Sequence, residues 1–117
     1  MRHLVAFLDD LFFTVKIADA AKHAGLAVAF VKTGDALFAL LGQTPSAVVI
    51  DLNYASADPI TLVERIKADF PSTPVIGFVS HVQAELREKA RLAGCDAVLA
   101  RSVFSTQLPE VLRQYAA

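Results

Sequence analysis

The chain has 117 residues, 55% of them hydrophobic, and its 11 basic and 12 acidic side chains give a formal net charge of −1. A chain of this length can bury a core without disulfides, so we expect residues 1–117 to form one domain. The charge balance lacks the basic excess needed to bind nucleic acid directly, and the short apolar runs predict no membrane span and no signal peptide. We therefore expect a cytoplasmic protein.

Two strand–helix pairs are predicted in the first third of the chain. The apolar run Leu4–Leu8 indicates a strand, and after Asp9-Asp10 a helical pattern extends to Gly25, a residue type common just past a helix end. A second apolar run at residues 27–31 precedes a short helix that ends before Gly42. The spacing is typical of alternating strands and helices.

The run Ala47–Asn53 lies at the centre of this pattern. It is apolar up to Asp51, which indicates a strand buried on both faces. We expect the carboxylate of Asp51 to stand exposed where the strand leaves the core.

The alternation continues after this central strand. Asp58 followed by Pro59 has the pattern of a helix N-cap and a first helical residue, and the apolar run at residues 75–79 predicts a fourth strand. Ser80 and Gln83 have the spacing of a capping box, so we expect Ser80 to cap the next helix.

A fifth strand is predicted at residues 97–100, and a last helix from about Ser105, with Pro109 in or near its first turn. Five strands alternating with five helices predict a doubly wound α/β domain with a five-stranded parallel sheet covered on both faces. In such folds ligands gather beyond the carboxyl ends of the strands.

Three carboxylates follow strands in this scheme, namely Asp9, Asp10 and Asp51. Carboxylates that converge on one edge repel one another unless a cation neutralises them. Oxygen ligands without His or Cys favour a hard ion such as Mg²⁺. An aspartate beside such an ion can accept a phosphoryl group as an acyl phosphate.

Four short motifs follow one another along the chain, each at or near the start or end of a predicted strand. They are Leu8-Asp9-Asp10, Val49-Ile50-Asp51-Leu52-Asn53, Pro71-Ser72-Thr73-Pro74-Val75-Ile76 and Ala93-Gly94-Cys95-Asp96-Ala97. In this order and spacing, nearly the whole chain resembles the receiver domain of two-component response regulators, as an atypical member. The resemblance implies the flavodoxin-like (βα)5 receiver fold.

The resemblance also implies a site. Asp9 and Asp10 would hold Mg²⁺, Asp51 would ligate the ion and accept the phosphoryl group, and the backbone carbonyl of Asn53 would complete the protein ligands. Such a protein is a signalling module and not an enzyme, beyond self-catalysed phosphorylation and dephosphorylation of its aspartate.

The chain departs from the family at the positions that sense the phosphate. Val79 stands where a Thr or Ser hydroxyl is expected, and the adjacent Ser80 would need a bulge to replace it, because successive strand side chains point to opposite faces. Arg101 stands at the position of an essential Lys, and Val98 at that of a switch aromatic. The loop at residues 54–57 lacks the family's Met-Pro pair. These departures predict slow chemistry and weak switching.

Two hypotheses follow. In the first, a histidine kinase or phosphotransfer protein phosphorylates Asp51 in a phosphorelay, and the module then contacts a downstream protein. In the second, Arg101 pairs with Asp51 as an internal cation, and a phosphorylation-independent pseudo-receiver acts as an interaction or dimerisation module, with a homodimer as one form. Leu11 and Phe12 are a candidate apolar partner surface in either case, since the first helix is where phosphodonor proteins dock in the family. The alternative is that Phe12 folds over the sheet edge as ordinary core.

A third hypothesis is a flavodoxin-like cofactor binder. It lacks support because Asp9-Asp10 stands where a Gly-rich phosphate loop would follow the first strand. Of the remaining reactive side chains, Cys95 is expected to be a small buried residue, and His81 is expected near the site without a catalytic role.

Overall fold

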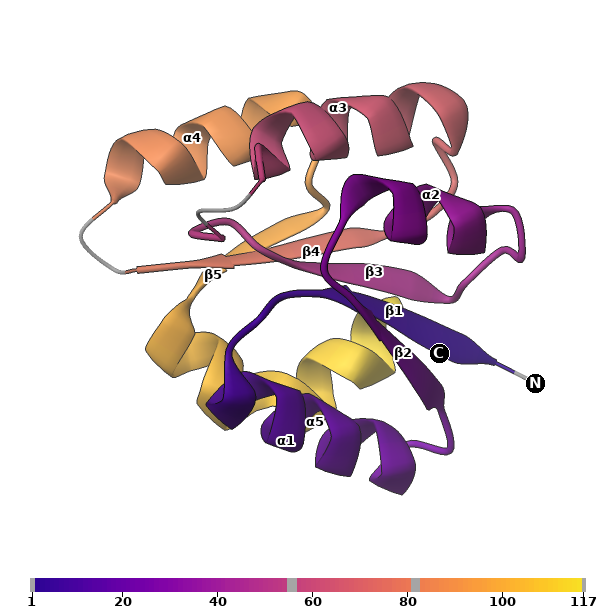
Figure 1. Ribbon diagram of the computed structural model, residues 1–117. Coiled ribbons are helices and arrows are strands. Elements are labelled where there is room, and N and C mark those ends of the chain that lie inside the picture. Colours follow the sequence, from indigo (N-terminus) through magenta and orange to yellow (C-terminus); the bar gives the residue numbers. More distant parts are fainter. Residues whose placement is uncertain (1, 55–56, 81–82, 117) are drawn as a thin grey trace.

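The computed structural model describes residues 2–54, 57–80 and 83–116, and within these ranges five strands alternate with five helices (Figure 1). The elements are β1 (His3–Phe7), α1 (Leu11–His23), β2 (Ala27–Val31), α2 (Gly34–Leu41), β3 (Ala47–Asp51), α3 (Pro59–Asp69), β4 (Val75–Val79), α4 (Ala84–Ala93), β5 (Ala97–Ala100) and α5 (Arg101–Tyr115). The predicted strand–helix alternation is confirmed.

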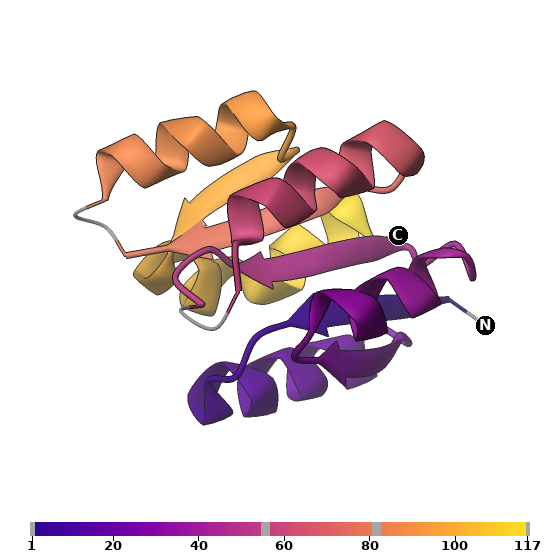
Figure 2. The ribbon, with the colours of Figure 1, turned by 45° about the horizontal axis from the view of Figure 1, so that its top comes forward.

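All strand pairs are parallel, and the sheet order is β2-β1-β3-β4-β5 (Figure 2). The order reverses between β1 and β3, which places the carboxyl end of β3 at the point where ligands bind in doubly wound folds. Asp51 is in register with Phe78, and Val79 with Ala100. The ends of β3, β4 and β5 therefore lie along one edge of the sheet.

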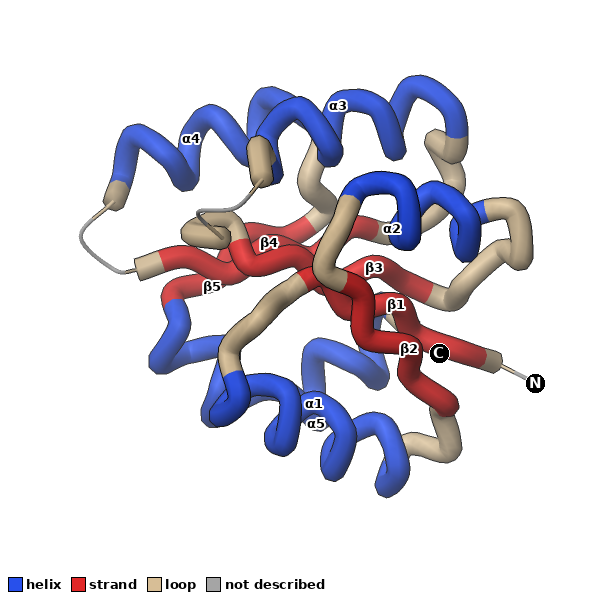
Figure 3. The backbone as a smooth tube through the Cα atoms, viewed as in Figure 1, coloured by secondary structure: helices blue, strands red, loops and turns tan. Residues whose placement is uncertain are grey.

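Helices cover both faces of the sheet. α1 and α5 lie on one face, and α2, α3 and α4 lie on the other (Figures 1 and 3). Alternate residues of the central strands enter two separate apolar clusters: Val49 packs with residues of α1 and α5, and Val48 with residues of α2 and α3. This double burial explains why β3 is a continuous apolar run in the sequence.

Three helices begin at side-chain caps. The Oδ1 of Asp10 accepts a hydrogen bond from the Phe13 amide at 3.1 Å, and the Thr33 hydroxyl accepts one from Ala36 at 3.1 Å. Asp58 caps α3, with Pro59 as the first helical residue, which confirms the prediction.

The start of α4 differs from the prediction. The helix begins at Ala84 with Gln83 as its N-cap, and no side chain bonds to the cap. The backbone carbonyl of Ser80 accepts a hydrogen bond from the Gln83 amide at 3.2 Å. The prediction that Ser80 caps the helix was therefore wrong, because this turn uses backbone groups.

The start of α5 also differs. The helix begins at Arg101, directly after β5, so Pro109 lies in its interior and not near its first turn. Pro109 has no N–H to offer the Ser105 carbonyl one turn earlier. The Nζ of Lys16 on α1 lies 3.5 Å from that carbonyl oxygen and donates to it. The helix continues because its apolar stripe is buried against the sheet: Phe104, Leu108, Val111 and Leu112.

Among the helices of residues 2–54, 57–80 and 83–116, none combines the length and the apolar character that crossing a membrane requires.

Candidate functional site

Asp51 is the last residue of β3, and it is buried, with only 6% of its surface exposed. The expectation of an exposed carboxylate was wrong, because neighbouring elements close over the strand end. Its Oδ1 accepts a hydrogen bond from the Asn53 amide at 2.9 Å. Burial is the largest influence on the Asp51 carboxyl and raises its pKa, while the Asn53 amide and Arg101 act in the opposite direction.

Arg101 lies between two of the predicted acidic residues. Its Nη2 donates to Oδ2 of Asp10 at 2.7 Å, and its Nη1 lies 3.5 Å from Oδ1 of Asp51. The guanidinium is a single cation shared between the two carboxylates, as in the hypothesis in which Arg101 pairs with Asp51. It is the first residue of α5 and directly follows β5, so it lies at the edge of the sheet where β3 also ends.

Aromatic rings form the rest of the Arg101 environment. The guanidinium carbon lies 5.0 Å from the ring centroid of Phe13 and 5.3 Å from that of Phe78. Phe78 stacks on Phe104, with centroids 4.7 Å apart and ring planes at 6°. A cation over ring faces gains electrostatic stabilisation, and Arg stacks on rings better than Lys does. We call the rings of Phe13, Phe78 and Phe104 the aromatic floor of the site. The sequence did not predict it, because Phe13 and Phe78 lie at positions with the pattern of core residues.

Asp9 does not join the other two carboxylates. Its Oδ1 pairs with Nζ of Lys32, just after β2, at 2.9 Å, and both side chains are more than half exposed. Within residues 2–54, 57–80 and 83–116, no group of three or more His, Cys, Asp or Glu side chains is arranged to hold a metal ion. With Arg101 in this position the carboxylates do not fit a shared ion, and Mg²⁺ at Asp9, Asp10, Asp51 and the Asn53 carbonyl stays a prediction.

The side chain of Asn53 joins two loops, which the sequence did not indicate. Its Oδ1 accepts a hydrogen bond from the Ser80 amide at 3.0 Å, and its Nδ2 donates to Oε1 of Gln83. The loop after β3 is thereby tied to the loop after β4. An Asn in a loop has no periodic pattern, so only the structure shows which groups it binds.

The residues at the switch positions are apolar. Val79 is 1% exposed and packs in the core beneath α2 and α3, and Val98 lies half-buried in β5 against the same core. Val79 offers no hydroxyl to the Asp51 pocket. The Ser80 amide is held by Asn53, as described above.

The apolar start of α1 is exposed, and Phe12 does not fold over the sheet edge as core. Leu11 is 78% exposed and Phe12 59%, while Phe13 is buried and takes part in the aromatic floor. Their role as a partner surface stays a prediction.

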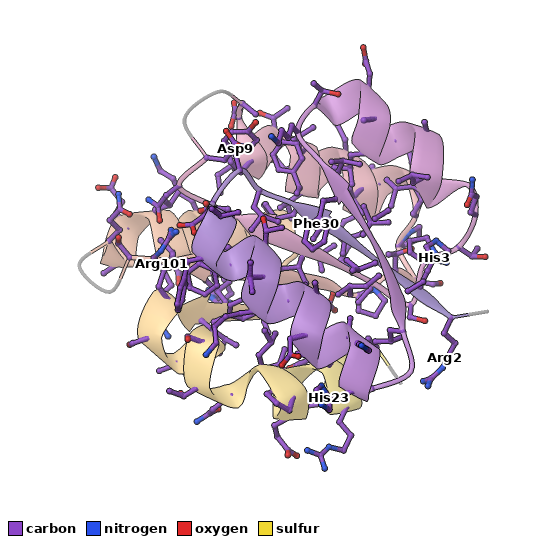
Figure 4. The ribbon with its side chains drawn as sticks, turned by 60° about the horizontal axis from the view of Figure 1, so that its bottom comes forward. Arg2, His3, Asp9, His23, Phe30 and Arg101 are labelled. Carbon is purple, nitrogen blue, oxygen red and sulfur yellow. The ribbon has the colours of Figure 1, made fainter. Side chains whose placement is uncertain are left out.

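Figure 4 shows Asp9 and Arg101 toward one end of the molecule, and Arg2 and His3 toward the other. Cys95 is half-buried, and burial raises the pKa of its thiol to about 12, so it is not a reactive thiolate. His81 and part of the loop at residues 54–57 lie outside the described residues.

No protein-family model matches the chain, and no curated protein matches it at a significant level. Solved structures do. A putative response regulator from Chloroflexus aurantiacus superposes with a TM-score of 0.84 at 19% identity, over 98% of this chain and 97% of that one. The receiver domain of NtrX from Brucella abortus gives 0.83 at 21% identity, over 97% of both chains.

The chemotaxis response regulator CheY4 of Vibrio cholerae gives a TM-score of 0.82 at 15% identity, over 98% of both chains. The similarity thus extends over nearly the full length of this chain and of these neighbours. The chain has the flavodoxin-like fold of response-regulator receiver domains.

Proposed function

We propose that the chain is a receiver-type signalling module that acts through protein–protein contacts without phosphorylation. The observation that carries the proposal is the guanidinium of Arg101, which donates to Asp10 and lies beside Asp51. It supplies within the chain the positive charge that an acidic pocket of this kind requires.

The environment of Arg101 favours this internal pairing. The Asp51 side chain is buried, and that of Arg101 is 29% exposed, so solvent screens their interaction less than it screens a surface ion pair. The planar guanidinium also packs over the rings of Phe13 and Phe78. A metal ion in its place would not stack on these rings. An incoming cation or phosphoryl group would have to displace these contacts before it reached Asp51.

A second candidate function is phosphorylation of Asp51 in a phosphorelay. It is favoured by the place of Asp51 at the carboxyl end of the central strand, beside Asp10, in a receiver fold. In this candidate, Asp9 and Asp10 hold Mg²⁺, Arg101 moves away, and a histidine kinase or phosphotransfer protein contacts Leu11 and Phe12. A downstream protein target would then recognise the phosphorylated form.

Intact-mass spectrometry separates the two functions. The protein is incubated with Mg²⁺ and a small acyl phosphate, and the wild type is compared with Asp51→Asn and Arg101→Ala. We expect no phosphoryl adduct on the wild type or on Asp51→Asn. An adduct on Arg101→Ala alone would identify the guanidinium as the obstacle.

An adduct on the wild type that disappears in Asp51→Asn would instead establish the second candidate and overturn the first. The phosphodonor incubation is repeated without Mg²⁺ as a control, because phosphoryl transfer to an aspartate needs the charge neutralisation that the ion supplies.

A further inference from the structure

One face of α1 is largely uncovered by the residues that the structure describes, with Lys16 partly buried at its middle. Phe12, Val15, Lys16, Asp19 and His23 recur at spacings of three and four residues, which places them on one stripe of the helix. Phe12 and Val15 are 59% and 60% exposed, although both are large apolar residues. Two neighbouring exposed apolar side chains on one helix face, with charged residues beside them, are typical of an interface.

The stripe borders a groove between α1 and α5. The groove has a volume of about 730 Å³, and Val15, Lys16, Asp19 and His23 line it from α1 while Thr106 and Pro109 line it from α5. Figure 4 shows His23 near the end of α1, where that helix passes beside α5. The groove is wide and mainly apolar, so a helix laid along α1 would contact both of its walls.

The charges on this stripe are incompletely paired. Among the described residues, no carboxylate lies within ion-pair distance of Lys16, whose Nζ instead donates to the Ser105 carbonyl. Asp19 pairs with Nδ1 of His23 at 3.6 Å, and both side chains are more than 70% exposed. Each α1 thus presents one cation and one anion three residues apart, next to the exposed apolar pair Phe12 and Val15.

From this complementarity we propose that α1 is a homodimer interface in which the α1 helices of two copies pack antiparallel. The register that places Lys16 opposite Asp19 of the second copy also places Asp19 opposite Lys16 of that copy, as twofold symmetry requires. In the same register Phe12 lies opposite the exposed imidazole of His23 in the second copy. Val15 lies level with Ala20, which is itself 9% exposed and packs in its own core, so Val15 faces the apolar lining of the groove. The two charge pairs form together in this register.

A second copy fits this stripe better than an unrelated helix for a geometric reason. The register has its symmetry axis between Ile17 and Ala18, and α1 runs from Leu11 to His23, so the axis falls at the middle of the helix. Both helices therefore overlap along nearly their full length of about 20 Å. A helix from another protein would have to supply the same order of charges independently.

This inference names a second copy of the chain as the partner of the proposed interaction module, and in that respect it rests on the proposed function. It is tested by the state of association, whereas phosphorylation of Asp51 is tested by mass. Each can therefore fail while the other stands.

The test is sedimentation equilibrium of the full chain over a range of concentrations, with wild type, Lys16→Asp, Asp19→Lys and the double variant that carries both changes. We expect a concentration-dependent dimer for the wild type. Each single reversal sets two like charges against each other at both symmetric positions, so the dissociation constant should rise by about tenfold or more. The double reversal restores opposite charges and should restore the dimer.

Two further variants separate the apolar contribution from loss of folding. Phe12→Ala should weaken the dimer, while Leu92→Ala, which truncates another exposed apolar residue on α4, should not. Arg91→Glu, also on α4, is the matched charge control and should leave association unchanged. Circular dichroism confirms that each variant is folded.

A wild type that stays monomeric at every concentration would overturn the proposal and would leave the groove to a different protein. A double reversal that fails to restore association would also overturn it, because the charge register would then be wrong.

Discussion

At the scale of single residues, the properties of Asp51 depend on groups from distant parts of the chain. The amide of Asn53 is close in sequence, but Arg101 comes from the start of α5 and Asp10 from the start of α1. The aspartate is thus a buried carboxylate with a partly shared counter-ion. Such a group carries a measurable dependence of stability on pH.

We predict that Asp51→Asn is more stable than wild type by a larger margin near neutral pH than at about pH 4. Burial raises the Asp51 pKa above its ordinary 3.8. At pH values between 3.8 and the raised pKa of the folded state, the folded state binds more protons than the unfolded state. The contribution of Asp51 to stability therefore falls as the pH rises through this range. Urea unfolding of both proteins at the two pH values measures the margin. An equal margin at both would contradict the prediction.

We predict that Arg101→Ala lowers the free energy of unfolding by about 1–3 kcal/mol, because it leaves the Asp10 and Asp51 carboxylates without their shared donor. The control is Arg113→Ala. Arg113 pairs with Glu110 at 2.8 Å, but both side chains are about 70% exposed, and the loss should be within about 0.5 kcal/mol. Chemical unfolding curves of the two variants give the comparison. Equal losses would mean that the Arg101 site does not differ from a surface pair.

The sequence predicted that Asp10, Asp51 and Arg101 meet at this site and offered the Arg101–Asp51 pair as one hypothesis, but it also placed Asp9 there, which pairs with Lys32 instead. Asp10, Asp51 and Arg101 each follow an apolar run, and parallel strands bring such positions to one edge. The direction of the Arg101 side chain depends on the rings of Phe13 and Phe78, whose own positions depend on how α1 and α5 pack on the sheet. That packing has no local signal in the sequence.

At the scale of elements, the junctions between helices and strands depend on a few backbone positions. The end of α4 is one of them. Gly94 has a φ of +118°, and its amide bonds to carbonyls of the last helical turn. Nearby, Lys67 pairs with Asp96 at 2.7 Å and donates to the Thr73 carbonyl, which ties α3 to the turn before β5.

We predict that Gly94→Ala destabilises the fold by about 1–2 kcal/mol, because an L-residue is strained at positive φ. A Cβ at this position would also lie 2.7 Å from Cγ of Lys67. The matched control is Gly42→Ala at the end of α2, where φ is −64° and a Cβ meets nothing within 4 Å. That change should stabilise by about 0.4–1 kcal/mol. Thermal unfolding of both variants should move the midpoint in opposite directions; a shift in the same direction would refute the assignment.

We predict that Asn53→Ala speeds hydrogen exchange at the Ser80 amide, which loses its acceptor, while the core strands keep their protection. Exchange measured by NMR on wild type and variant reports this directly. Gln43→Ala, at an exposed position after α2, is the control. Unchanged exchange at Ser80 would mean that the link between the two loops does not hold the β4–α4 loop in place.

The element boundaries show where sequence patterns are sufficient and where they are not. The strands and the cap at Asp58 were predicted correctly because alternation, apolar runs and cap residues are local signals. The start of α5 was misplaced because Pro109 normally indicates a first turn. Here the burial of Phe104 and Leu108 against the sheet outweighs the missing hydrogen bond.

At the scale of the whole molecule, the two faces of the sheet differ in how completely they are covered. α2, α3 and α4 lie over one face, whereas α1 and α5 lie over the other (Figure 1). A groove runs between α1 and α5. An interface along that groove would extend the core of one copy into the next. Its formation would then contribute to the stability of each copy.

We predict that the thermal midpoint of the wild type rises with protein concentration, because association stabilises the folded state by mass action. The midpoint of Lys16→Asp should change less over the same range. Differential scanning calorimetry at several concentrations measures both. Parallel behaviour of the two proteins would argue against α1 as the site of association.

The direct passage from β5 into α5 has a kinetic consequence for the site. Ala100 is both the last residue of the strand and the N-cap of the helix, and its register with Val79 anchors it to the sheet. The backbone that bears Arg101 is therefore fixed on both sides. The guanidinium can leave Asp51 only by rotation about its own side-chain bonds, and not by the slower opening of a loop. We therefore expect access to the carboxylate to depend on rotation of the Arg101 side chain, and spin relaxation at the Arg101 Nε would measure its rate.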